Sequence, residues 1–313
     1  MTHYAEQNWA AASDLVLRAG GYAVVVVNRD GATVWVRYAS GFDPATAVDI
    51  ASAQKSVVAM LLARSVHRHR LTNDTAISDI LGPGWSRAPR HIERDITLAH
   101  LLGMTGGLTE TLEPAAPPGH TWAYSNAGIH MLKHVLTTLH GTDLDTLSHE
   151  LLFAELGLGA RWLPRRTLDG GGIVTGPLGE PVYALVASAD DLVHIGRHLL
   201  ATSPHAPVFG DASSATRPNP AWRDGWWLAC GRPHQLPDNT RHDRPLVDSA
   251  PADAYLAIGA GLNRIYVLPG SGLAMAWLGP RTGNLAMPEL AAVDKPFFAT
   301  IKNGVRHATA DSW

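Results

Sequence analysis

The sequence predicts an α+β fold in which both ends of the chain contribute strands to one antiparallel sheet flanked by helices. Near the start, residues 22–27 and 33–38 are rich in the β-branched and aromatic side chains that favour strands. Near the end, residues 264–268 and 273–278 repeat this composition on either side of a Pro-Gly turn. The interval between these pairs has a mostly helical pattern. We therefore expect a single domain over residues 1–313 that contains an inserted, mainly helical subdomain.

The same pattern sets the boundaries of the two parts. We expect the α/β part at about residues 1–65 and 205–313, and the helical part at about residues 66–204. Because the sheet needs strands from both chain ends, the two parts are not independent domains.

Composition narrows the class of protein. The 313 residues are 46% hydrophobic, which is enough to bury a sizeable core. The net charge of −3 gives no reason to expect a nucleic acid or a membrane surface as partner. The single cysteine, Cys230, excludes an intrachain disulfide. Residues 1–9 are polar and no apolar run is long enough to span a membrane, so we expect a cytoplasmic protein.

The strands and helices follow from local patterns. A helix over residues 7–19 ends at Gly20-Gly21, and a turn at residues 28–31 joins the first two strands into a β-hairpin. Residues 211–251 are rich in Pro, Trp, Asp and Arg without periodicity, so we expect loops and short strands that border a pocket. The later helices are expected at residues 74–80, 96–102, 127–139, 188–200 and 288–303.

A further helix, starting near Asp49, carries a Ser-x-x-Lys motif. Apolar side chains fill nearly every position over residues 57–62, which is typical of a buried helix. Ser52 and Lys55 are three residues apart and so share one helix face. A serine becomes a nucleophile when a neutral amine takes its proton. The first helical turn and burial both disfavour the charged form of Lys55, and the same helix end stabilises an oxyanion at Ser52.

Other motifs surround this one in a characteristic order. They are Ser52-Ala53-Gln54-Lys55, residues 96–108, Tyr124-Ser125-Asn126, residues 186–192 and residues 259–269. Over roughly residues 20–280 the chain resembles the superfamily of serine β-lactamases and penicillin-binding proteins. It is similar in particular to the class C-like branch of esterases and amidases, which includes 6-aminohexanoate-dimer hydrolases. The resemblance implies a β-lactamase-like fold and a covalent acyl-enzyme.

The resemblance also implies roles for individual residues. Ser52 attacks the acyl carbon, and Lys55 or a Tyr124 phenolate takes its proton. These two groups titrate as a coupled pair, so which of them is the base stays open. Asn126 hydrogen-bonds the substrate amide or orients Lys55. The backbone N–H groups of Ser52 and Ala260 form the oxyanion hole.

The third motif departs from the family pattern. Relatives that act on β-lactams usually carry Lys-Thr-Gly, whereas here the aligned residues are Ala257-Ile258-Gly259. The missing cation disfavours β-lactam or peptidoglycan substrates and favours an ester or amide without a carboxylate. Arg264 or Arg241 remains able to supply a cation from another angle. Leu262-Asn263 replaces a Gly-Gln pair that is frequent in relatives, so the second oxyanion donor also stays open.

Substrate binding is expected at Ile258, Gly259, Trp226 and Trp227, although the tryptophans are equally compatible with packing under a long loop. The expected function is a serine hydrolase that cleaves a small-molecule ester or amide. The alternative is an acyltransferase that uses the same residues. A β-lactamase or peptidase is disfavoured by the apolar third motif, and a non-catalytic sensor by the intact Ser, Lys and Tyr. The oligomeric state is not fixed by the sequence.

Two histidine pairs have the four-residue spacing that presents two imidazoles to a metal on a helix, His130 with His134 and His194 with His198. Neither pair has Glu after its first histidine, and sixteen histidines make such spacings frequent by chance. We therefore expect neither a metal nor a cofactor.

Overall fold

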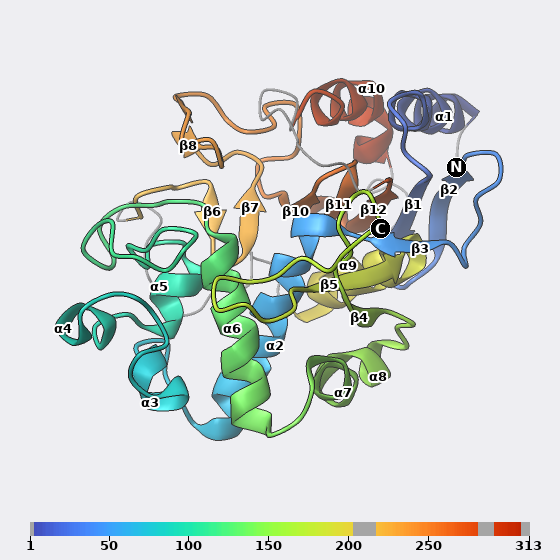
Figure 1. Ribbon diagram of the computed structural model, residues 1–313. Helices are drawn as coiled ribbons and strands as arrows, with labels where there is room; N and C mark the ends of the chain where they lie inside the picture. Colours follow the sequence, from blue (N-terminus) through green and yellow to red (C-terminus); the bar gives the residue numbers. More distant parts are fainter. Residues whose placement is uncertain (1–2, 203–216, 281–290, 308–313) are drawn as a thin grey trace.

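The computed structural model describes residues 3–202, 217–280 and 291–307. A seven-stranded antiparallel sheet, in the order β2-β1-β12-β11-β10-β7-β6, has helices on both faces (Figure 1). Its strands are β1 (Ala23–Asn28), β2 (Thr33–Tyr38), β6 (Trp222–Arg223), β7 (Trp226–Leu228), β10 (Tyr255–Gly259), β11 (Asn263–Leu268) and β12 (Leu273–Leu278). The prediction of an α+β fold with a sheet built from both chain ends is confirmed.

The centre of the sheet joins the first strand to the last. β1 pairs with β12 from Ala23↔Leu278 to Asn28↔Leu273, and with β2 through the predicted hairpin. Its valines are buried on both faces, which is why the strand has a continuous β-branched run rather than an alternating pattern. Gly31 has φ +89°, a left-handed conformation that the hairpin turn needs and glycine adopts without strain.

Helices cover the two faces of the sheet. On one face α1 (His3–Arg18) packs beside α10 (Asp294–His307), and on the other α9 (Ala189–Thr202) packs against β11 and β12 (Figure 1). Gly196 allows the close approach of α9, because a Cβ there would lie 3.0 Å from the Ala274 Cβ. Residues 288–290 of the last predicted helix lie outside the described residues, and α10 begins at Asp294.

The remaining helices lie between residues 54 and 156, where α2 packs against α6 and α6 also contacts α3 and α5 (Figure 1). They are α2 (Gln54–His69), α3 (Ile77–Leu81), α4 (Arg90–Glu93), α5 (Leu98–Leu102), α6 (Asn126–His140), α7 (Leu144–Ser148) and α8 (Ala154–Leu156). Side-chain caps set three of the starts: Thr97 accepts from the His100 N–H, Ser125 from the Gly128 N–H and Asp143 from the Thr146 N–H. No helix among the described residues is both long and apolar enough to cross a membrane.

A second, three-stranded sheet is an element that sequence patterns missed. Its order is β3 (Ala47–Asp49), β5 (Tyr183–Ser188) and β4 (Arg161–Pro164). β4 and β5 fall in the segment predicted as mainly helical, and β3 is too short to show an alternation. In the predicted loop region, β8 (His234–Gln235) and β9 (Arg241–His242) form a small hairpin. The part of that region before residue 217 lies outside the described residues.

Candidate active site

Ser52 lies in a single 3₁₀ turn, Ala51–Ala53, immediately before α2, and not within the helix proper. Ala51 has φ +52°, a conformation that costs free energy for a residue with a Cβ. The Ala51 N–H donates to Asp49 Oδ1 over 2.9 Å, and Arg165 donates to both oxygens of Asp49 over 3.0 Å each. These contacts hold the turn in its strained form and so fix the position of Ser52.

Lys55 connects the predicted catalytic residues. Its side chain is only 4% exposed, and Nζ donates to Ser52 Oγ over 3.1 Å and to Asn126 Oδ1 over 2.8 Å. The same Nζ lies 4.7 Å from the centroid of the Tyr124 ring. Two segments distant in the sequence, Ser52–Lys55 and Tyr124–Asn126, therefore meet at one point.

The backbone of Asn126 is held by a carboxylate that sequence reasoning did not identify. Glu110 accepts from the Asn126 N–H over 2.8 Å and from the Ala127 N–H over 3.1 Å. A carboxylate at a helix N-terminus satisfies unpaired N–H groups and complements the positive end of the helix dipole. Because Glu110 lies in a loop, no helical pattern marks it as a cap of α6.

A second buried lysine lies behind Lys55. Lys133 Nζ donates to Gln54 Oε1 and to the Tyr183 carbonyl, both over 2.7 Å, and lies 4.5 Å from the centroid of the Trp162 ring. Burial holds the pKa of Lys133 well below its usual value, and the nearby positive charges of Arg165 and Lys55 lower it further. The base of the site therefore contains a second buried amine, and burial disfavours the charged form of that amine.

The end of β10 packs directly on the turn that carries Ser52. A Cβ at Gly259 would lie 2.0 Å from the Ile50 carbonyl oxygen and 3.0 Å from the Ala53 nitrogen, so only glycine fits here. Ala260 follows this strand, and its carbonyl accepts from Asn263 Nδ2 over 2.7 Å. The end of the third motif therefore packs against the residues on either side of Ser52.

Ile258 and Arg264 face the other side of the sheet. They are paired across β10 and β11, so their side chains share a face, and Arg264 Nε donates to Asp294 Oδ1 of α10 over 3.0 Å. Arg264 is 1% exposed and also donates to the Gly259 carbonyl over 2.8 Å. Ile258 therefore reaches the Ser52 side only through its backbone. Arg264 does not supply the cation missing from the third motif.

The two predicted pocket tryptophans occupy different environments. Trp226 is fully buried, with its ring centroid 5.5 Å from that of Tyr255, and therefore packs in the core. The ring centroid of Trp227 is 5.0 Å from that of Trp222. The Trp222 centroid is in turn 6.3 Å from the ring centroid of Tyr124. Trp227 thus belongs to an aromatic cluster that backs the Tyr124 side of the site. Both side chains are too buried to line an open pocket in this structure.

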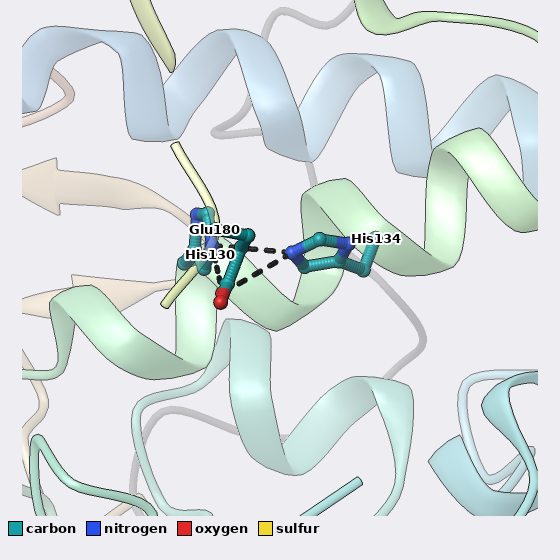
Figure 2. Close-up of side chains that lie close together, drawn as sticks. All are labelled: His130, His134 and Glu180. Carbon is teal, nitrogen blue, oxygen red and sulfur yellow. Dashed lines mark hydrogen bonds and ion pairs between the residues drawn. The ribbon is translucent and has the colours of Figure 1, made fainter. Parts of the chain in front are cut away.

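The side chains of His130 and His134 on α6 also lie close to that of Glu180 (Figure 2). Burial and the neighbouring His134 lower the pKa of His130 to about 4, against the opposing effect of Glu180. The sequence marked the two histidines only by their spacing and gave no signal for Glu180, which is 50 residues after His130.

Comparison with known proteins gives a family match. The model of the Beta-lactamase family matches residues 16–293. A search of curated proteins found no significant match. Among solved structures, a Bacteroides dorei protein assigned as a beta-lactamase has a TM-score of 0.70 at 15% identity, covering 95% of this chain and 98% of its own. A Bacillus anthracis protein assigned as a 6-aminohexanoate-dimer hydrolase has a TM-score of 0.66 at 15% identity, covering 96% and 83%. EstCE1, a hydrolase with promiscuous acyltransferase activity, has a TM-score of 0.66 at 14% identity, covering 96% and 98%.

Proposed function

The chain belongs to the Beta-lactamase family, and on that premise we propose that it is a serine hydrolase that cleaves an ester or amide through an acyl-enzyme on Ser52. The observation that carries the proposal is the position of Lys55 Nζ, buried and within 3.1 Å of Ser52 Oγ. Nucleophilic serines need a base within hydrogen-bond reach, and that base needs an orienting partner. Asn126 Oδ1, 2.8 Å from Nζ, meets the second requirement.

The proposed reaction has two steps. Ser52 Oγ attacks the carbonyl carbon of the substrate, and its proton passes to the neutral amine of Lys55 or to a Tyr124 phenolate. The tetrahedral intermediate collapses when the bond to the leaving alcohol or amine breaks, and that group takes up the proton. Water then attacks the acyl-serine and loses a proton to the same base. The second tetrahedral intermediate collapses when the bond between the acyl carbon and Ser52 Oγ breaks, Oγ takes up that proton, and the carboxylic acid leaves.

The oxyanion of each intermediate needs two donors. The Ser52 N–H, in the turn that leads into α2, is one candidate, since the helix dipole also favours negative charge there. The Ala260 N–H is the second. Its assignment is supported by the tight packing of Gly259 against Ile50 and Ala53, which brings the end of β10 next to the turn of Ser52.

The substrate is proposed to lack the carboxylate that β-lactams carry. An ionised group that enters a buried site is strongly disfavoured unless a cation pairs with it. The third motif supplies apolar and backbone groups only, and Arg264 is held by Asp294 on the far face of the sheet. Arg241 lies in the separate β8–β9 hairpin. Neutral esters and simple amides therefore suit the site better than penicillins do.

Paired kinetics on one preparation test this substrate class. We expect kcat/KM for p-nitrophenyl butyrate to exceed that for nitrocefin by at least about tenfold, equivalent to about 1.4 kcal/mol of transition-state free energy. Each substrate should also be assayed with Arg241→Ala, which should leave the ratio unchanged. A nitrocefin rate tenfold above the ester rate would overturn the proposed substrate class. A fall of that rate in Arg241→Ala would identify the cation.

Acyl transfer to an alcohol or amine is a second candidate, favoured by one observation. EstCE1, of similar fold, is described as having promiscuous acyltransferase activity. The acyl-enzyme is common to both reactions, and only the acceptor in the second step differs. Product analysis with butanol added to the ester assay distinguishes them: butyl ester in preference to butyric acid indicates a transferase.

A further inference from the structure

Three side chains direct their potential ligand atoms toward one another beside α6, those of His130, His134 and Glu180 (Figure 2). The two histidines are one helical turn apart, and Glu180 comes from the loop between β4 and β5. His130 Nε2 lies 2.5 Å from Glu180 Oε1, and His134 Nε2 lies 3.1 Å from His130 Nε2 and 3.4 Å from Glu180 Oε1. Each residue thus offers one ligand atom to a common centre.

These separations are those of ligands around a small metal ion. With bonds of about 2.0–2.1 Å, the ligands of a tetrahedral zinc ion lie about 3.3 Å apart. The three atoms of this cluster lie within 4.8 Å of one another, and two of the three pairs lie at 3.1 and 3.4 Å. A small movement of Glu180 away from His130 is sufficient to admit the ion.

Hydrogen bonds within the described residues do not satisfy this cluster. The side chain of His130 is 7% exposed and that of Glu180 is 20% exposed. Glu180 Oε2 and His130 Nδ1 are buried without a hydrogen-bond partner there. Buried polar atoms without partners are rare, and they call for an explanation such as a bound ion or water. Glu180 Oε2 is therefore available as a second carboxylate ligand.

The local backbone leaves room for such an ion. A Cβ at Gly176 would lie 2.5 Å from Glu180 Oε1 and 2.6 Å from His130 Nε2, so a glycine is required beside the cluster. The Gly176 N–H also donates to the Glu180 carbonyl over 2.7 Å, which closes the turn that presents Glu180. The loop is therefore shaped around the point where the three ligand atoms meet.

We propose that His130, His134 and Glu180 form a binding site for a first-row divalent transition-metal ion such as Zn²⁺, which clamps the loop of residues 165–182 onto α6. Two imidazoles with one carboxylate suit zinc, cobalt or nickel better than magnesium or calcium, which prefer oxygen ligands. The side chain of His134 is 38% exposed, so a water molecule completes the coordination from the solvent side.

The proposed metal ion is linked to the active site through both ends of the loop of residues 165–182. At one end Arg165 holds Asp49, which fixes the turn of Ser52, and at the other Glu180 holds His130. His130 lies one helical turn after Asn126 on α6. The ion is thus a positioning element for the site and takes no part in the reaction, so its binding does not depend on the chemistry proposed for Ser52.

Metal titration of the full chain tests the site. After removal of metals with EDTA, ZnCl₂ is titrated by calorimetry into wild type, His134→Ala, Glu180→Gln and the control His194→Ala. His194 belongs to the other histidine pair of equal spacing, on α9. We expect one equivalent bound by wild type and by His194→Ala. The affinity of His134→Ala and Glu180→Gln should fall by about 100-fold or more, because loss of outer-shell partners alone costs 10- to 100-fold.

Two further readouts separate a built site from adventitious binding. Co²⁺ in place of Zn²⁺ should give visible absorption bands that His134→Ala lacks, and Zn²⁺ should slow amide exchange in residues 165–182. Ser52→Ala should bind Zn²⁺ as wild type does. The site is ruled out by a wild-type affinity no higher than that of His134→Ala and Glu180→Gln, or by an equal loss in His194→Ala.

Discussion

At the scale of single residues, Lys55 is central to the proposed catalysis. Its amine contacts Ser52, Asn126 and the face of the Tyr124 ring at once, in a position that is 4% exposed. A buried lysine without these contacts would carry a large desolvation cost. The proposed function gives this amine a specific role, to take the proton of Ser52, which a merely structural cation would not do.

We therefore expect Lys55→Met to lower kcat/KM for p-nitrophenyl butyrate by about 10²- to 10⁴-fold, the usual contribution of a general base. Methionine keeps most of the volume, so the variant should fold, as circular dichroism will verify. The control is Lys295→Ala, which removes a lysine of α10. This lysine pairs with Asp248 and has no contact with Ser52 or Asn126 among the described residues. Activity of Lys55→Met within tenfold of wild type would exclude the amine from proton transfer.

At the scale of secondary-structure elements, the site forms where the N-terminal ends of α2 and α6 come together. The turn before α2 is fixed by Asp49 and Arg165, and the first residues of α6 are fixed by Glu110. Neither set of contacts involves the reacting atoms. Each places a side chain by holding the backbone that carries it, and small displacements of this kind are costly to catalysis.

Glu110→Gln tests this positioning role. It removes the charge and one of the two acceptors that cap α6, so stability should fall by about 0.5–2 kcal/mol. Displacement of Asn126 should also lower kcat/KM by about 10- to 100-fold. Glu113→Gln, in the same loop but more than half exposed and 3.7 Å from Arg87, should change neither. If both variants retain full activity while Glu110→Gln is destabilised, the cap is only structural.

At the scale of the whole molecule, the main sheet could be predicted because the residue composition of its longer segments by itself indicates strands. The valine run of β1 and the apolar runs of β11 and β12 specify buried strands without knowledge of their partners. The second sheet was not predictable, because β3 has three residues and pairs with β5 from a distant part of the chain. No local alternation marks such a strand.

The residues of the site likewise fall into those that the sequence identified and those that it did not. Ser52 and Lys55 share one helical turn, so their contact follows from spacing, and the family resemblance added Tyr124 and Asn126. Glu110, Asp49, Arg165 and Glu180 act through contacts with residues distant in the sequence, and no spacing rule identifies them. The sequence leaves Arg264 open as a cation for the substrate, but its place in the pairing of β11 with β10 turns its side chain toward Asp294. The side of a strand that a residue faces is decided by register, which the sequence alone left open.

The central claim, an acyl-enzyme on Ser52, is tested most directly by intact-protein mass spectrometry after rapid quenching with acid during turnover of p-nitrophenyl butyrate. Wild type should gain the mass of one butyryl group, located by peptide mapping at Ser52. Ser52→Ala should gain none, and it should retain less than about a thousandth of the wild-type rate. A butyryl group on any other residue, or an Ser52→Ala variant that still turns over the ester, would contradict it.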